Sequence, residues 1–156
     1  KPYNIAPAAP NTIRSIEGGM LSYVSDITLQ DDPFVIGMDR FINLEQEDDF
    51  IGKAALTKIK AEGPKRRLVG IEISGAPLAG SNEHYWPISN NGEVIGHVTR
   101  CVYSPRLEKN IGWANLTTEN STIGTEIILQ TPDGERPSVV CEAPWMKPQI
   151  KIPPLD

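Results

Sequence analysis

Near the start of the chain, apolar residues follow helical spacing and then end at a pair of glycines. Ile13 and Ile16 lie three positions apart on one predicted helix face, and Asn11 precedes them in the position of an N-cap. The glycines at positions 18–19 predict the end of this helix, because glycine accepts left-handed backbone conformations. Glu17 would then lie at the negative end of the helix dipole, which is unfavourable for a carboxylate and makes it a candidate for function. The alternative is a solvated surface glutamate.

The next part of the chain gives weaker patterns. Asp26 is expected to point outward from the segment that follows the glycines. Apolar runs at 34–38 and 41–44 predict strand-like structure. A helix is predicted from about 50 to 61, with one broad apolar face and an aspartate cap at position 48 or 49.

From residue 66 onward, short alternating runs predict β structure. Asn90-Asn91-Gly92 lies between two of these runs and indicates a hairpin, since asparagine and glycine tolerate positive φ. Several short strands at this spacing predict a small antiparallel barrel or sandwich over residues 66–145. The proline-rich ends, 1–10 and 146–156, are expected to be extended. The fold class is therefore α+β. The predicted strands cover residues 68–73, 86–89, 93–99, 111–116, 125–130 and 137–141.

Charge and composition narrow the possible functions. The 156 residues carry a net charge of -5, which argues against duplex nucleic acid or an anionic membrane as a partner. The basic cluster at 65–67 is expected to flank a strand. No apolar run is long enough to span a membrane. Cys101 and Cys141 match no metal-ligand spacing and fit free thiols in a reducing, cytoplasmic compartment, with a disulfide as the alternative.

Known catalytic motifs are missing from the sequence. It has no glycine-rich phosphate loop, no helical His-Glu zinc pair and no Gly-x-Ser-x-Gly elbow. His84 and His97 are isolated, so no metal site is expected. The three tryptophans are expected to anchor the core or the C-terminal tail, with stacking on a planar ligand as the alternative.

Four motifs occur in order along the chain: Ile16-Glu17-Gly18-Gly19-Met20-Leu21-Ser22-Tyr23, Asp49-Phe50-Ile51-Gly52-Lys53-Ala54-Ala55-Leu56, Gly96-His97-Val98-Thr99 and Tyr103-Ser104-Pro105-Arg106-Leu107-Glu108-Lys109-Asn110-Ile111-Gly112. In order and at compatible spacing, they resemble the C-terminal half of the glycine-cleavage T-protein (aminomethyltransferase) family. The resemblance covers nearly the whole chain. Within the family, the wording of residues 16–23 is closer to tetrahydrofolate-dependent demethylases, such as dimethylsulfoniopropionate demethylase, than to the glycine-cleavage enzyme.

This resemblance implies a folate enzyme about twice the length of this chain. Residues 1–62 would complete an α/β folate-binding subdomain, and residues 66–145 would form the C-terminal barrel. Glu17 matches the family glutamate that binds the pterin of tetrahydrofolate, and Tyr23, expected to point outward, matches a nearby aromatic position. The family transfers a one-carbon unit to folate with help from an acidic residue of the N-terminal half. The catalytic residue of this protein is therefore unknown, and the N-terminal half of the same protein is the expected partner.

The sequence also departs from the family pattern. Tyr23-Val24 replaces a tyrosine-glycine pair, so a different backbone path is expected there. Arg100 replaces a small residue and would project toward a ligand, as a cofactor-binding residue, or toward a neighbouring subdomain. The C1 donor would be a small methylated compound or an aminomethyl-carrier protein. The chain alone is expected to be inactive. The alternative function is a non-catalytic folate-binding or regulatory module.

Overall fold

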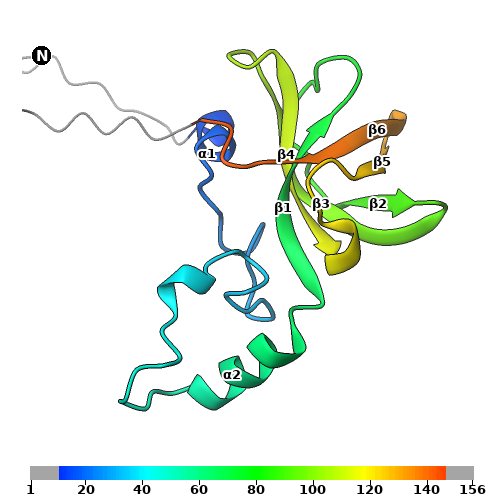
Figure 1. The fold of residues 1–156 in the computed structure, drawn as a ribbon. Helices are drawn as coiled ribbons and strands as arrows, with labels where there is room; N and C mark the ends of the chain where they lie inside the picture. Colours follow the sequence, from blue (N-terminus) through cyan, green and yellow to red (C-terminus); the bar gives the residue numbers. More distant parts are fainter. Residues whose placement is uncertain (1–10, 147–156) are drawn as a thin grey trace, which may run out of the picture.

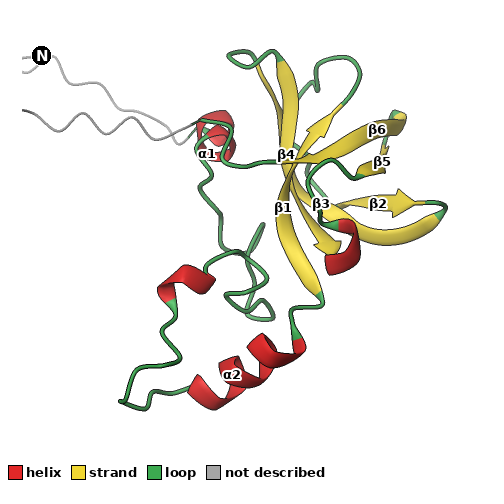
Figure 2. Ribbon diagram, in the orientation of Figure 1, coloured by secondary structure: helices red, strands yellow, loops and turns green. Residues whose placement is uncertain are grey.

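The computed structural model describes residues 11–146, and most of this part forms a closed barrel of six antiparallel strands (Figure 1). The strands follow one another around the barrel in the order β1-β4-β3-β2-β5-β6. The predicted barrel is confirmed, and all six predicted strands are present (Figure 2). Their bounds are β1 Arg66–Ile73, β2 Trp86–Asn90, β3 Glu93–Ser104, β4 Lys109–Thr117, β5 Glu126–Thr131 and β6 Gly134–Cys141.

The barrel interior is filled by apolar side chains from every strand. Because side chains alternate across a strand, the residues between them face outward. The hairpin between β2 and β3 turns as predicted, with Asn91 at φ 49° and Gly92 at φ 81°, the positive angles of a two-residue hairpin turn. The interior core consists of Ile71, Ile73, Ile88, Ile95, Val98, Cys101, Ala114, Leu116, Ile127, Leu129 and Val140.

Helix α1, Thr12–Glu17, packs on the outside of the barrel against β3 and β4. Asn11 caps its start as predicted, accepting a hydrogen bond from the Arg14 backbone N–H at 3.2 Å. Ile16 is fully buried in a second apolar cluster on the outer surface of the barrel. That cluster contains Ile16, Leu68, Val102, Ile111 and Trp113.

The segment between α1 and the barrel differs from the sequence prediction. Residues 34–44 form turns and the short 3₁₀ helix η1, Asp39–Phe41, so the predicted strands there are wrong. Gly37, at φ 69°, interrupts the extended path. Helix α2, Lys53–Glu62, begins three residues later than predicted, and Gly52 precedes it in place of an aspartate cap.

No residue of α2 is buried, so its predicted apolar face contacts no core in the described part of the chain. Figure 1 shows this helix set apart from the barrel. A second 3₁₀ helix, η2 Thr118–Asn120, follows β4. The expected extended ends lie outside the described residues, apart from Met146. Within residues 11–146, no helix is long and apolar enough to cross a membrane.

Candidate functional site

Glu17 is a buried carboxylate on the last turn of α1. Only 5% of the residue is exposed, so the surface alternative is wrong. The chain turns sharply after it: the Gly19 N–H donates to the Ile16 carbonyl and the Met20 N–H donates to the Ser15 carbonyl. With Gly19 at φ 75°, this pair of bonds is a Schellman motif, which ends the helix where the glycines predicted.

Strand β3 holds the Glu17 side chain in place. The Ser104 hydroxyl donates a hydrogen bond of 2.6 Å to Glu17 Oε1. Within residues 11–146, no arginine, lysine or histidine lies within ion-pair distance of this carboxylate. The Glu17 carboxylate is therefore oriented by a neutral hydroxyl and has no described cation beside it.

Asp26 is also buried, with 3% of the residue exposed, so the expectation that it points outward is wrong. Its Oδ2 accepts hydrogen bonds from the Ser22 backbone N–H at 2.8 Å and from Arg100 Nε at 2.7 Å. Its Oδ1 accepts a hydrogen bond of 2.6 Å from the Thr99 hydroxyl. Arg100 also forms an ion pair with Asp26 through Nη2, so the charge of this carboxylate is compensated.

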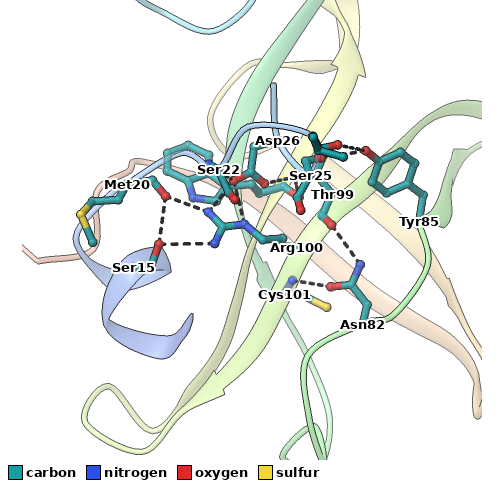
Figure 3. Close-up of polar contacts among 12 residues, drawn as sticks. Ser15, Met20, Ser22, Ser25, Asp26, Asn82, Tyr85, Thr99, Arg100 and Cys101 are labelled. Atoms are coloured by element: carbon teal, nitrogen blue, oxygen red, sulfur yellow. Dashed lines mark hydrogen bonds and ion pairs between the residues drawn. The ribbon is translucent and has the colours of Figure 1, made fainter. Parts of the chain in front are cut away.

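The guanidinium of Arg100 reaches from β3 to Ser15 and Met20 (Figure 3). Nη2 donates to the Met20 carbonyl at 2.7 Å, and Nη1 donates to the Ser15 hydroxyl at 3.3 Å. All three nitrogens of this side chain thus have protein partners. Arg100 thus contacts residues of the segment that precedes the barrel, and its predicted role in cofactor binding stays a prediction.

Tyr23 and Val24 lie on the surface next to these buried groups. Tyr23 is 63% exposed and points outward, as expected. Val24 has φ 77°, a left-handed conformation that favours glycine, the residue of the family pattern at this position. The expected difference in backbone path from the family stays a prediction. The Tyr85 hydroxyl donates to the carbonyls of Val24 and Ser25, which ties this turn to the loop before β2.

An open groove of about 600 Å³ runs beside Arg100. Its walls come from the turn at Ser22–Ser25, the loop at Ser81–Tyr85, and β3. Glu17 is absent from the residues that line this groove. The groove is polar, lined by hydroxyl, amide and charged side chains.

The other sequence candidates have structural roles. Cys101 and Cys141 are both free thiols, so the disulfide alternative is wrong. His97 lies on β3 and stacks on Tyr85 with ring centroids 4.6 Å apart, and burial lowers the pKa of its imidazole. Trp113 is buried against Trp145, which fits the expected anchoring role. In the part of the chain that the structure describes, no three histidine, cysteine or acidic side chains gather to hold a metal ion.

Sequence reasoning missed Ser104 and Thr99 as partners of the two buried carboxylates. Both residues lie within sequence motifs shared with the family, and this was the only indication in the sequence that they could belong to the site. Their pairing with Glu17 and Asp26 depends on contacts 87 and 73 positions apart, which no local pattern encodes.

The fold defines a small closed β-barrel domain with a helical segment docked on its outer face. The model of the glycine cleavage T-protein C-terminal barrel domain matches residues 66–147, more than half of the chain. The chain therefore belongs to the glycine cleavage T-protein family.

Individual relatives extend the similarity beyond the barrel. Dimethylsulfoniopropionate demethylase from Ruegeria pomeroyi is 33% identical over 143 residues, which are 91% of this chain and 38% of that protein. An aminomethyltransferase from Clostridium botulinum (strain Okra) is 39% identical over 140 residues, 88% of this chain and 36% of that protein. The chain thus spans little more than a third of the length of these relatives.

A solved structure has the same fold. The crystal structure of the glycine cleavage system aminomethyltransferase T from Bartonella henselae matches 84% of this chain and 36% of that protein, with a TM-score of 0.74 and 20% sequence identity. At this identity the likeness concerns the fold alone.

Proposed function

We propose that this chain supplies the folate-binding glutamate and the C-terminal barrel of a tetrahydrofolate-dependent one-carbon transferase. The observation that carries the proposal is the buried, hydroxyl-oriented carboxylate of Glu17. Burying a charge is costly unless a partner compensates it, and the described residues offer Glu17 no cation. A bound ligand with N–H donors would supply the missing partner.

The chemistry of Glu17 fits the aminopyrimidine edge of a pterin. A carboxylate has about four lone-pair directions, and Ser104 uses one of them on Oε1. The remaining directions can accept two N–H groups in a fork, and such charge-assisted bonds strengthen where water is excluded. Tyr23, exposed nearby, is proposed as a secondary contact. Tetrahydrofolate, when bound, would supply the nitrogen that accepts the one-carbon unit.

The relatives suggest two classes of C1 donor. The Ruegeria pomeroyi relative is named a dimethylsulfoniopropionate demethylase, which points to a small methylated compound. The Clostridium botulinum relative is named an aminomethyltransferase, which points to an aminomethyl group as the unit transferred. We propose transfer from one of these donors to folate, with the catalytic acid outside this sequence.

The proposed partner is the preceding part of the same polypeptide. Met20, Tyr23 and Val24 are 61%, 63% and 67% exposed around the Glu17 segment. These residues lie within five positions of the chain, and we propose that they form part of a contact surface. The chain spans little more than a third of these relatives, and we propose that the N-terminal half of the same protein covers these residues.

A glutamine substitution at Glu17 tests the proposal. In the full-length protein, Glu17→Gln is expected to weaken tetrahydrofolate binding by about 1–3 kcal/mol, because one ligand N–H would face an amide N–H in place of a carboxylate oxygen. This loss corresponds to roughly 5- to 150-fold in Kd by titration calorimetry.

Glu126→Gln serves as the matched control, since Glu126 is an exposed glutamate on β5. Equal affinities for the Glu17 variant and the unmodified protein would overturn the role of Glu17. The full-length protein is then supplied with each class of C1 donor. An enzyme would form product, whereas the alternative, a folate-binding or regulatory module, would bind folate without forming product.

A further inference from the structure

The segment that carries Glu17 is held to β3 on both sides of this residue. Ser15 precedes Glu17, Met20 and Asp26 follow it, and Arg100 contacts all three (Figure 3). We call this set of contacts the arginine clasp. Two of its contacts, Ser15 and Met20, are the first and last residues of the Schellman motif that ends α1 at Glu17.

A β-bulge in β3 directs Arg100 toward this segment. Val98 pairs with Ala114 and Arg100 pairs with Trp113, so Thr99 is the extra residue. In a regular strand Val98 and Arg100 would share one face, and Val98 lies in the barrel interior. The bulge instead turns Arg100 outward beside Thr99, so both side chains reach Asp26.

Beyond the bulge, regular alternation places two more outward residues in line with Arg100. Val102 belongs to the outer apolar cluster with Ile16, and Ser104 donates to Glu17. Three outward-facing residues of β3 therefore hold the end of α1. Arg100 binds the turn after the helix, Val102 packs in one cluster with Ile16, and Ser104 binds the Glu17 carboxylate.

We propose that Arg100 is a positioning residue for Glu17, which it holds in the orientation that binds the pterin. The proposal rests on the proposed function, since it assigns Arg100 a role in the same folate site. Arg100 acts through the segment on both sides of Glu17, because its nitrogens bind the Ser15 hydroxyl before this residue and the Met20 carbonyl and Asp26 carboxylate after it. The planar guanidinium is suited to this, since it presents donors in several fixed directions.

A double-mutant cycle on folate affinity tests the proposal in the full-length protein. Arg100→Met is expected to raise the Kd for tetrahydrofolate by about tenfold in the unmodified background. In the Glu17→Gln background the same substitution is expected to change the Kd less than about twofold, because the group being positioned is already altered. An equal loss in both backgrounds would show that Arg100 affects folate binding independently of Glu17, and would overturn the proposal.

Two further measurements separate positioning from general stability. Hydrogen exchange is expected to rise at residues 15–26 in Arg100→Met while the barrel strands keep their protection. Arg136→Met is the matched control, because Arg136 binds the Ala76 carbonyl on another part of the barrel and is expected to leave the Kd unchanged. If Arg100→Met folds poorly, Ser15→Ala removes one clasp contact and is expected to raise the Kd about two- to threefold.

The outcomes for the two proposals are distinct. A normal Kd for Arg100→Met, together with a weakened Glu17→Gln, would reject the clasp and leave the proposed function standing. A normal Kd for Glu17→Gln would reject the Glu17 assignment and the clasp with it. Unchanged exchange at residues 15–26 in Arg100→Met would reject the clasp independently of folate.

Discussion

At the scale of single residues, Val24 carries backbone strain. A β-branched residue at φ 77° pays about 1–2 kcal/mol relative to an ordinary conformation. The Val24 N–H donates to the Ile27 carbonyl at 2.7 Å, and its carbonyl accepts from Tyr85 at 3.0 Å. These two bonds hold the strained turn, which forms part of the groove wall beside Arg100. Strained residues often cluster at functional sites.

Replacing this valine with glycine should stabilise the protein. Val24→Gly is expected to raise the free energy of unfolding by about 0.5–1 kcal/mol, since relief of φ strain exceeds the entropy that glycine adds to the unfolded chain. Urea denaturation measures the change. Val94→Gly is the control, because Val94 on β3 is 68% exposed, like Val24 at 67%, but lies in ordinary strand conformation. The control should lose stability; a loss in both variants would contradict the strain at Val24.

The buried carboxylates of Glu17 and Asp26 differ in how well the sequence predicted them. Glu17 was identified through its position against the helix dipole and through the family motif. Asp26 was expected to face solvent, because its partners Thr99 and Arg100 lie 73 and 74 positions away. Whether a carboxylate is buried depends on such distant partners. The sequence could therefore indicate Glu17 as a functional candidate, but it could not predict the burial or the hydrogen-bond partners of either carboxylate.

At the scale of elements, helix α1 depends on Gly19 for two separate reasons. Its φ is 75°, and a Cβ there would lie 2.9 Å from the Cβ of Pro144, in the segment after β6. A side chain at position 19 would therefore strain the Schellman turn and also push this segment away. Gly19 thus allows the end of α1 to pack closely against Pro144, which follows β6.

A pair of alanine substitutions separates these two effects. Gly19→Ala is expected to reduce the free energy of unfolding by about 2–4 kcal/mol, combining backbone strain with overpacking. Gly37→Ala is the control, since Gly37 has φ 69° but a Cβ added there would meet nothing within 4 Å, and this change should cost about 1–2 kcal/mol. Thermal or urea unfolding of both variants gives the comparison. Equal losses would show that the Pro144 contact contributes nothing.

Local sequence signals predicted some elements well and others poorly. The hairpin at 90–92 was predicted because its turn residues alone determine the geometry. Strand β3 continues to Ser104, beyond its predicted end at position 99, because pairing with β4 extends it past the bulge. The apolar runs at 34–44 were wrongly assigned as strands, since no neighbouring strand pairs with them in the described residues.

At the scale of the whole molecule, closure of the barrel isolates Cys101 from solvent. Its side chain is fully buried in the interior, and burial raises the pKa of its thiol to about 12. Cys141 on β6 is half-buried, and burial raises the pKa of that thiol to about 11. Since the thiolate is the reactive form, both cysteines should react slowly in the folded protein.

Thiol labelling at pH 8 tests this isolation. We expect Cys141 to react first with Ellman's reagent and Cys101 to react only as fast as the barrel unfolds globally. The Cys141→Ala variant isolates the Cys101 phase, and its rate should follow the unfolding rate measured in urea. Rapid labelling of Cys101 without denaturant would contradict a closed barrel.

The same pKa shifts set a direction for alkaline stability. Unfolded thiols ionise near pH 8.5, whereas the folded ones hold their protons to about pH 11 or 12. The stability that depends on these protons is therefore complete below about pH 8.5 and declines as the pH rises toward the folded values. A Cys101→Ala variant should show a smaller decline than the unmodified chain over this range.

The strands of the barrel were predictable because six short alternating runs and the hairpin signal at 90–92 marked them in the sequence. The full order of the strands was not, because β1 pairs with β4 and β6, and β2 pairs with β5, and these pairings connect distant parts of the chain. The alternating runs fitted a barrel or a sandwich, and the family resemblance favoured the barrel. The packing of α1 on β3 and β4 could not be predicted, because it depends on side-chain contacts between residues far apart in the sequence.

The bonds from Asp26 to Arg100 and from Glu17 to Ser104 each close a loop of more than seventy residues. Most of the chain between Asp26 and β1, including α2, packs on no interior core residue of the barrel. Loop-closure entropy grows only with the logarithm of length, so doubling such a loop costs about 0.6 kcal/mol. Insertions or deletions around α2 can therefore accumulate during evolution while the orientation of Glu17 stays fixed by β3.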